Sequence, residues 1–208
     1  MRAALTGSCT STTSSAPRLP DPGARPRAAR GRRTRSGPPP GKPPDAKLLR
    51  RVRLVLLDVD GVLTDGRLWL GPHGDEWKSF HVHDGLAIVR AIAAGLVVAV
   101  LSSRRSRAVA GRCAELGLTE VHQGVSDKLT AYEALARRHG CRDEVVAAMG
   151  DDLADLPVLR RVALPVAPAN AVAEVRRAVR WVTIRPGGAG AVREALETIL
   201  RAQGRWRS

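Results

Sequence analysis

The sequence has few cysteines, few aromatic residues and no long apolar run. Its three cysteines, Cys9, Cys113 and Cys141, show no CxxC spacing, so neither a zinc site nor a disulfide framework is indicated. Aromatic residues make up 3% of the 208 residues, too few for a base-stacking platform of the usual kind. No apolar run approaches the about 18 residues of a membrane span, and no secretory h-region follows the first arginine. We therefore expect a cytoplasmic protein with reduced thiols and no membrane partner.

Positive charge is abundant but unevenly distributed. The formal net charge is +14, and residues 1–50 hold eleven Lys or Arg against Asp21 and Asp45, which leaves only +5 for the rest. That remainder has no recognisable nucleic-acid-binding pattern, so nucleic acid is not expected as a partner. Residues 1–46 are rich in Ser, Thr, Pro, Gly, Arg and Ala and are predicted to form a disordered tail. A misassigned start codon or an Arg-rich targeting peptide would have the same composition.

From Val52 onward, short apolar runs alternate with amphipathic stretches. Strands are predicted over 54–57, 96–101, 120–123, 145–149, 162–166 and 181–183. Helices are predicted to start at Asp84, Asp127 and Asn170, and a last one covers 191–202. This βαβ alternation predicts one α/β domain over 47–208, a three-layer Rossmann-like fold with a parallel sheet. Residues 67–82 interrupt the alternation and are predicted to form a small β-hairpin, too short to be a cap domain.

Two aspartates follow the first predicted strand directly. Asp58 and Asp60 come after the apolar run 54–57, and residues two apart in an extended chain point to the same side. Ligands of parallel α/β sheets bind beyond the carboxyl ends of the strands, which is where these carboxylates lie. Because two carboxylates this close repel each other, we expect a cation with a preference for oxygen ligands, such as Mg²⁺, between them.

Two other interpretations fit parts of this segment. Asp-Gly and Thr-Asp-Gly are common turn sequences, so a purely structural turn remains an alternative. An EF-hand calcium loop also opens with Asp-x-Asp, but it needs Gly at its sixth position and Glu at its twelfth. Those positions hold Leu63 and Trp69, which excludes the EF-hand.

The acidic strand ends suit phosphoryl transfer. Asp58 is predicted to be the nucleophile, because a carboxylate can attack phosphorus and form an aspartyl-phosphate that water then hydrolyses. Asp60 is predicted to donate a proton to the leaving alkoxide and later to accept one from that water. A second acidic pair follows the strand predicted over 145–149. Of this pair, Asp151 is predicted to be a further metal ligand, and Asp152 to complete or orient the ligand shell.

Three polar residues are predicted to hold the phosphate group. Ser102 and Arg104 follow the strand 96–101, where a hydroxyl and backbone N–H groups before a helix can bind phosphate oxygens; the alternative role of Ser102 is an N-cap. Lys128 begins a helix, where the dipole disfavours a cation unless an anion is near; its alternative is a solvated lysine. The glycine-rich segment 185–194 lacks the GxxxxGK[ST] pattern and is either a substrate-binding loop or a flexible turn.

With these residues, the chain from about 52 to 203 resembles the haloacid dehalogenase superfamily, and within it the small-cap 3-deoxy-D-manno-octulosonate 8-phosphate phosphatases. Five segments carry the resemblance in the family's order: 57–66, 80–85, 126–129, 149–155 and 187–194. The resemblance implies a Mg²⁺-dependent phosphomonoesterase that forms a homotetramer through its inserted hairpins. It also implies a nucleophile, an acid/base, a hydroxyl and a phosphate lysine at Asp58, Asp60, Ser102 and Lys128, with Mg²⁺ on Asp58, the Asp60 backbone carbonyl and Asp151.

Two positions depart from the family pattern. Ser102 stands where Thr is common, which keeps the hydroxyl. His83 stands where relatives commonly have Arg, which removes a fixed bidentate partner for the octulosonate carboxylate. Related proteins act on nonulosonate 9-phosphates or are non-catalytic modules of nucleotide-sugar synthesis. The sequence therefore predicts hydrolysis of a phosphorylated sugar acid, first 3-deoxy-D-manno-octulosonate 8-phosphate, with these two functions as alternatives.

Overall fold

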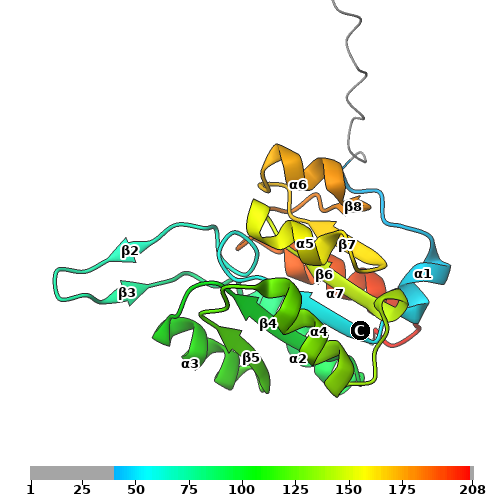
Figure 1. The fold of residues 1–208 in the computed structure, drawn as a ribbon, viewed down its shortest axis with the longest axis horizontal. Helices are drawn as coiled ribbons and strands as arrows, with labels where there is room; N and C mark the ends of the chain where they lie inside the picture. The colour runs from blue at the N-terminus through cyan, green and yellow to red at the C-terminus, as the bar shows by residue number, and fades with distance from the viewer. Residues whose placement is uncertain (1–39, 207–208) are drawn as a thin grey trace, which may run out of the picture. The chain divides into compact units, whose positions relative to one another are not determined.

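The computed structural model describes residues 40–206, which fold around a six-stranded parallel sheet (Figure 1). Its strand order is β5-β4-β1-β6-β7-β8, and each neighbouring pair is parallel. The strands are β1 (Leu54–Leu57), β4 (Val97–Ser102), β5 (Glu120–Gln123), β6 (Val146–Met149), β7 (Leu164–Ala167) and β8 (Trp181–Val182). The predicted parallel α/β sheet is confirmed, with a β1 that begins and ends where the apolar run does.

β1 lies between β4 and β6 in the sheet, and both of its faces are covered. Its four apolar side chains are all buried, and they alternate between the two faces. Val55 and Leu57 belong to one hydrophobic cluster, and Leu54 and Leu56 belong to the other. Burial on both sides explains why the run is continuously apolar, and it places Asp58 at the carboxyl edge of the sheet.

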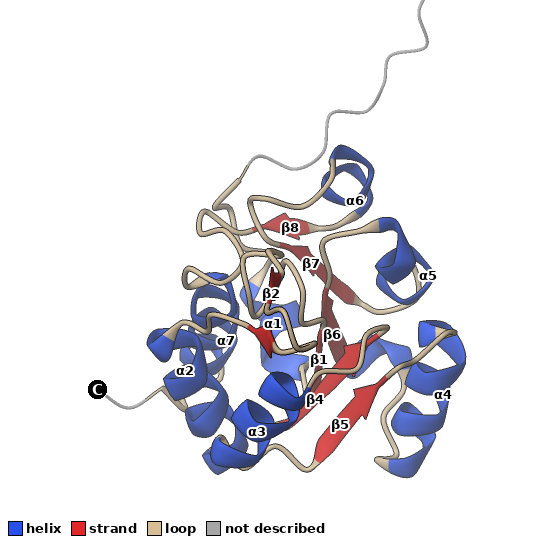
Figure 2. Cartoon of the chain, turned by 90° about the vertical axis from the view of Figure 1, so that its left-hand side faces the viewer, coloured by secondary structure: helices blue, strands red, loops and turns tan. Residues whose placement is uncertain are grey.

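Helices cover both faces of the sheet and complete the three layers (Figure 2). One face packs against α1 (Ala46–Arg51), α2 (Val82–Ala93), α3 (Arg107–Glu115) and α7 (Ala191–Ala202). The other packs against α4 (Lys128–Arg138), α5 (Leu156–Leu159) and α6 (Ala173–Ala178). Short 3₁₀ segments, η1 (Asp143–Val145) and η2 (Leu153–Asp155), lie before and after β6. None of the helices within residues 40–206 is long and apolar enough to span a membrane.

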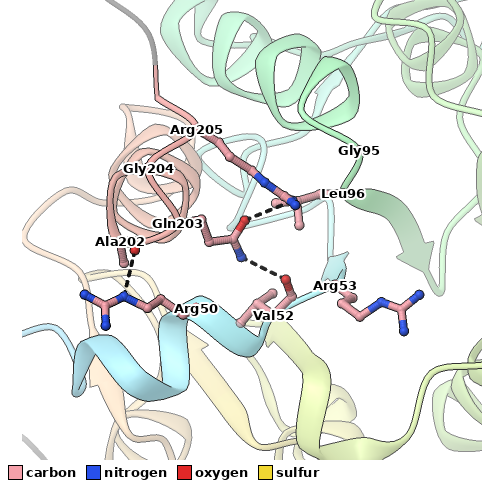
Figure 3. Close-up of a pocket in the computed structure, with 9 residues that line it drawn as sticks. All are labelled: Arg50, Val52, Arg53, Gly95, Leu96, Ala202, Gln203, Gly204 and Arg205. Atoms are coloured by element: carbon pink, nitrogen blue, oxygen red, sulfur yellow. Dashed lines mark hydrogen bonds between the residues drawn. The ribbon is translucent and has the colours of Figure 1, made fainter.

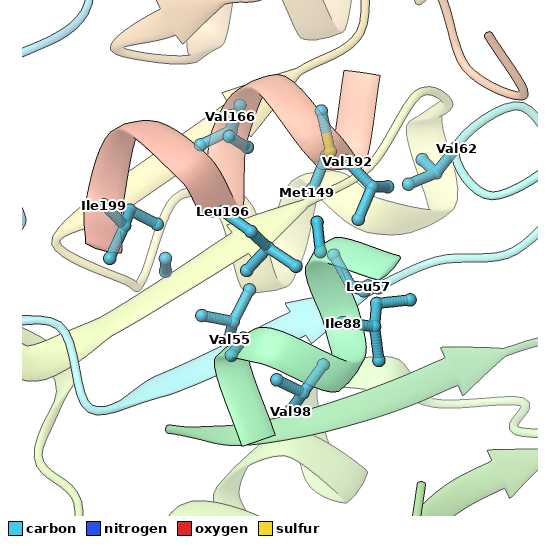
Figure 4. Close-up of a cluster of buried hydrophobic side chains, with 14 of the residues drawn as sticks. Val55, Leu57, Val62, Ile88, Val98, Met149, Val166, Val192, Leu196 and Ile199 are labelled. Atoms are coloured by element: carbon cyan, nitrogen blue, oxygen red, sulfur yellow. The ribbon is translucent and has the colours of Figure 1, made fainter. Parts of the chain in front are cut away.

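The longest helices of the first face meet over the central strands. Val192, Leu196 and Ile199 of α7 and Ile88 of α2 point toward Val55 and Leu57 of β1 (Figure 4). Each of these helical side chains is at most 1% exposed. α7 was predicted over 191–202, and that prediction is confirmed at both ends.

The predicted hairpin is present between β1 and α2. β2 (Trp69–Leu70) and β3 (Glu76–Trp77) pair in antiparallel fashion, and they project away from the sheet (Figure 1). Its apolar side chains are largely exposed: Leu68, Trp69, Leu70 and Trp77. The segment ends earlier than residue 82, because α2 already begins at Val82.

Two of the predicted helix starts are wrong. α2 begins two residues before Asp84, which is buried and accepts hydrogen bonds from the backbone N–H groups of Gly190 (3.2 Å) and Arg193 (2.6 Å). α6 begins at Ala173, and Asn170 instead bridges Gly61 and Gly187. Both side chains bind segments that are distant in the sequence, which a local capping pattern does not reveal. The start predicted at Asp127 is confirmed, since its carboxylate caps α4.

The tail predicted over residues 1–46 overlaps the described part of the chain. The N–H of Gly41 donates to the carbonyl of Val182 in β8 at 2.8 Å. Asp45 accepts a hydrogen bond from the N–H of Lys47 and caps α1. Residues 40–46 therefore belong to the folded body, and the remainder of the predicted tail lies outside the described residues.

Candidate active site

A tight turn carries the chain away from the carboxyl end of β1. The carbonyl of Val59 accepts hydrogen bonds from the N–H groups of Val62 (3.2 Å), Leu63 (2.9 Å) and Thr64 (3.0 Å). Gly61 has a φ of +82°, and a Cβ at this position would lie 1.9 Å from an Asp151 oxygen. Glycine is therefore required here for its backbone conformation and for the close approach of the second acidic strand end.

Three carboxylates converge at this edge of the sheet. Asp58 follows β1, Asp151 follows β6, and Asp155 ends η2. Each offers a carboxylate oxygen that lies within 4.8 Å of the other two. The structure thus brings Asp58 and Asp151 together, and their role as metal ligands stays a prediction. Asp152, in contrast, is outside the cluster, and its side chain accepts the N–H of Leu153 at 2.7 Å to cap η2.

Asp155 was not predicted as a site residue. One of its oxygens accepts the backbone N–H groups of Asp151 (3.0 Å) and Asp152 (3.2 Å). The other accepts a hydrogen bond from the Lys128 ammonium at 2.7 Å. Its spacing from Asp151 could have indicated this position. On a helical turn, a side chain four residues later returns to the same side of the chain, so Asp155 could have been expected near Asp151.

Lys128 is the cation of this cluster. Its Nζ lies 2.9 Å from Asp58 Oδ1 and 2.7 Å from Asp155 Oδ1, and its side chain is 5% exposed. It is the first residue of α4, where the helix dipole disfavours a positive charge. The two carboxylates remove that conflict, so the alternative of a solvated lysine is wrong.

The cluster has more negative than positive charge. Burial and the charge of Asp155 raise the pKa of Asp58 to about 6, although Lys128 opposes this. Burial and the neighbouring carboxylates of Asp58, Asp155 and Asp152 raise the pKa of Asp151 to about 7. Burial alone would lower the pKa of Lys128, but Asp58 and Asp155 raise it overall. Three carboxylates with one ammonium fit a hard divalent cation, which would relieve their repulsion.

Asp60 is not one of the three carboxylates of this cluster. Its carboxylate pairs with the Lys78 ammonium and lies 3.7 Å from Arg104 Nε. The shared face expected for Asp58 and Asp60 requires an extended chain, whereas β1 ends at Leu57 and the chain turns immediately after it. The metal ligand predicted at residue 60 is its backbone carbonyl, and that remains a prediction.

Residues at the base of the hairpin hold Asp60, and the sequence analysis missed them. The Lys78 side chain is 0% exposed, and its Nζ also lies 3.6 Å from a Glu76 oxygen. The other Glu76 oxygen accepts a hydrogen bond from Arg104 Nη2 at 2.7 Å. Glu76 and Lys78 are two residues apart in an extended segment, so the sequence could have predicted that their side chains point to the same side.

Ser102 and Arg104 lie at the end of β4, beside β1. Ser102 is 3% exposed, and its hydroxyl oxygen accepts the backbone N–H of Arg104 at 3.3 Å. The helix-cap alternative for Ser102 is wrong, because α3 begins at Arg107 after Ser106. The Arg104 guanidinium is half exposed and is shared between Glu76 and Asp60.

The glycine-rich segment before α7 braces the turn that follows Asp58. The N–H of Gly188 donates to the carbonyl of Val62 at 3.0 Å. A Cβ on Gly187 would lie 1.8 Å from the Gly61 carbonyl oxygen. The Asn170 amide donates to that same carbonyl at 3.0 Å and accepts the N–H of Gly187 at 2.6 Å. These bonds tie the segment to the turn after Asp58, so it is not the flexible turn that was one alternative.

Known proteins share this architecture. Residues 114–196 match the family model described as haloacid dehalogenase-like hydrolase. The 3-deoxy-D-manno-octulosonate 8-phosphate phosphatase of Escherichia coli K12 is 44% identical over 154 residues, 74% of this chain and 82% of that protein. The chain belongs to the haloacid dehalogenase-like hydrolases.

Solved structures place this hydrolase within the octulosonate 8-phosphate phosphatase group. The Yersinia pestis phosphatase is 41% identical with a TM-score of 0.76, covering 77% of this chain and 86% of that one. The Moraxella catarrhalis phosphatase, solved with a magnesium ion, a phosphate ion and KDO, is 36% identical with a TM-score of 0.75. That match covers 76% of this chain and 91% of the relative. The predicted family, fold and phosphatase class are confirmed.

Removal of the Lys128 charge should destabilise the metal-free hydrolase. We expect Lys128→Met to lower the free energy of unfolding by about 3–5 kcal/mol near pH 8, because Asp58 and Asp155 would be buried without a countercharge. Lys47→Met is the matched control, since Lys47 is exposed and makes no side-chain ion pair within residues 40–206. Its effect should stay within about 0.5 kcal/mol. Urea denaturation in EDTA at one protein concentration measures both, and equal effects would contradict the assignment.

Proposed function

We propose that this hydrolase cleaves the phosphate monoester of a sugar acid, with 3-deoxy-D-manno-octulosonate 8-phosphate as its substrate. The observation that supports this proposal is the convergence of Asp58, Lys128 and Asp151 at one strand edge. The relatives at 36–44% identity that carry this substrate in their names support the choice of sugar acid.

Asp58 acts as the nucleophile. Its carboxylate oxygen attacks phosphorus, and the bond from phosphorus to the sugar oxygen breaks. Asp60 donates its proton to that leaving oxygen and then accepts a proton from the water that hydrolyses the aspartyl-phosphate. Lys128, 2.9 Å from Asp58, supplies positive charge for the phosphate oxygens. Ser102 and Arg104 bind further phosphate oxygens from the neighbouring strand end.

Mg²⁺ is the proposed cofactor, and the donor set is made of the oxygen ligands it prefers. Asp58, Asp151 and the backbone carbonyl of Asp60 would hold it. When bound, it would neutralise phosphate charge and lower the repulsion between the carboxylates. Asp155 has both oxygens engaged already, by Lys128 and by the N–H groups of residues 151 and 152. We therefore assign Asp155 the role of orienting Lys128 and Asp151.

The nucleophile is tested by Asp58→Asn, which hardly changes the side-chain volume. Mg²⁺-dependent phosphate release should fall by about 10³-fold or more, because an amide cannot form the aspartyl-phosphate. The thermal midpoint of the variant without metal should equal or exceed that of the parent, since one repelling carboxylate is gone. Equal phosphate release by variant and parent would show that Asp58 is not the nucleophile.

The parent's substrate profile separates the alternative functions. The panel contains octulosonate 8-phosphate, a nonulosonate 9-phosphate and common sugar phosphates. A preference for the nonulosonate ester would identify that ester as the substrate. This outcome stays open because His83 stands where relatives commonly have the Arg that would bind the octulosonate carboxylate. No Mg²⁺-stimulated release from any ester would support a non-catalytic module.

The positioning role of Asp155 is tested against its neighbour Asp152. We expect Asp155→Asn to lower Mg²⁺ affinity or turnover about 10–100-fold, as loss of an outer-shell partner typically does. Asp152→Asn should change either quantity less than about threefold, because its side chain only caps η2. Calorimetric Mg²⁺ titration and steady-state kinetics measure the pair. A larger loss in Asp152→Asn than in Asp155→Asn would reverse the assignment.

The exposed hairpin supports a homotetramer in which hairpins of several subunits pack together. Leu70 is 69% exposed, and Trp69 and Trp77, which pair across the two strands, are 59% and 58% exposed. Isolated two-stranded hairpins are marginal in water, and clustered apolar exposure marks an interaction surface. The sugar-acid monoester would then bind near subunit contacts.

Leu70→Ser should weaken this assembly. We expect light scattering after size-exclusion chromatography to show a lower mass at micromolar concentration, because apolar contact area is lost. Ile184→Ser is the control, since Ile184 is 67% exposed but lies away from the hairpin. The proposal is wrong if the parent is a monomer or if both variants keep the parent's mass.

A further inference from the structure

A hollow in the surface lies where the chain enters β1 (Figure 3). It has a volume of about 750 Å³, within the roughly 300–1,000 Å³ of small-molecule sites. Its walls come from the carboxyl ends of three helices, α1, α2 and α7, and from the residues that enter β1 and β4. Arg53 precedes β1 and Asp58 follows it, so roughly 16 Å of extended chain separates the hollow from the catalytic edge.

Among residues 40–206, three arginines line this hollow, and no carboxylate does. Arg50 Nε donates to the carbonyl of Ala202 at 3.1 Å. Arg205 Nη1 donates to the carbonyl of Ala94 at 3.3 Å and to Gln203 Oε1 at 3.4 Å. Arg53 makes no side-chain hydrogen bond or ion pair within the described residues. Since a guanidinium has five N–H donors, most donors of this trio are available to a ligand.

Hydrogen bonds to backbone carbonyls hold together the chain segments that carry the arginines. Gln203 Nε2 donates to the carbonyls of Leu49 (3.2 Å) and Val52 (2.8 Å), which ties the end of α7 to the entry of β1. The N–H of Arg205 donates to the carbonyl of Leu200 at 2.8 Å. Arg50 and Arg205 are thus anchored before any ligand arrives, which reduces the entropy that binding would cost.

The ordinary role of arginine at a helix end does not account for this much charge. A helix carboxyl terminus carries roughly −0.5 charge, so three termini compensate at most roughly −1.5 of the +3. The hollow therefore keeps a net positive charge, which attracts an anion. Val52 and Leu96 add an apolar wall beside the guanidinium groups.

We propose that this hollow is a second anion site, which binds a small molecule with a dianionic phosphate or phosphonate group. The guanidinium groups of Arg53 and Arg205 hold the anion in charge-assisted hydrogen bonds, and the carbon part of the ligand lies along Val52 and Leu96. The site needs neither Mg²⁺ nor the catalytic carboxylates, so it is independent of the proposed turnover.

Phenylphosphonate is a suitable probe, because its carbon–phosphorus bond resists hydrolysis and its phenyl ring is apolar. Titration calorimetry in EDTA favours this site, since without metal the catalytic edge has three carboxylates that repel anions. We expect saturable binding at one site per chain. Arg53→Gln should weaken it about tenfold, the effect of losing a charge-assisted hydrogen bond of about 1.4 kcal/mol.

Arg176→Gln is the matched control. It removes the same charge from an exposed position on α6 that does not line the hollow. Phenylphosphonate affinity should stay within about twofold of the parent value, as expected for a charge screened by salt. Absence of saturable binding, unchanged affinity in Arg53→Gln, or equal losses in the two variants would each overturn the proposal. The Arg53 side chain makes no hydrogen bond or ion pair within residues 40–206, so the variant should keep the parent's thermal midpoint.

Discussion

The ion pairs of Lys128 with Asp58 and Asp155 are the interactions on which the catalytic edge depends. Three carboxylates lie within 4.8 Å of one another in a mostly buried position, where their mutual repulsion is only weakly screened. Lys128 holds the strand end of β1 and the turn after β6 to the start of α4. The remaining negative charge suits the proposed divalent cation and, through it, the proposed phosphate ester.

A second charged network connects the hairpin to the catalytic turn. Lys78, which follows β3, pairs with Asp60, while Glu76 binds Arg104 just after β4. The proposed acid/base carboxylate is thus held by the same segment that exposes Leu70 and two tryptophans. If subunits associate through the hairpin, their packing would also set the position of Asp60. Assembly and proton transfer would then share one structural element.

Polar side chains far apart in the sequence hold the catalytic turn in place. Asn170 joins the turn after β1 to the segment before α7, and Asp84 caps the start of α7 from α2. The left-handed Gly61 leaves room for Asp151 to approach. The turn also has apolar anchors of its own, since Val59, Val62 and Leu63 are buried. The basic hollow at the other edge of the sheet is built differently, from helix ends and backbone carbonyls.

The amino-acid sequence by itself determined the parallel sheet, the hairpin, and the residues Asp58, Asp151 and Lys128. A buried strand, an amphipathic helix and an acidic strand end each leave a local pattern, and parallel strands bring their carboxyl ends to one edge. Only the tertiary structure decided that Asp155 rather than Asp152 joins the cluster, that Lys78 holds Asp60, and that Asn170 and Asp84 are long-range braces. The reason is that each of these side chains also satisfies a common local role, as a cap, a turn or a solvated charge. Which role it takes depends on partners 17 or more residues away, as for Asn170 and Gly187.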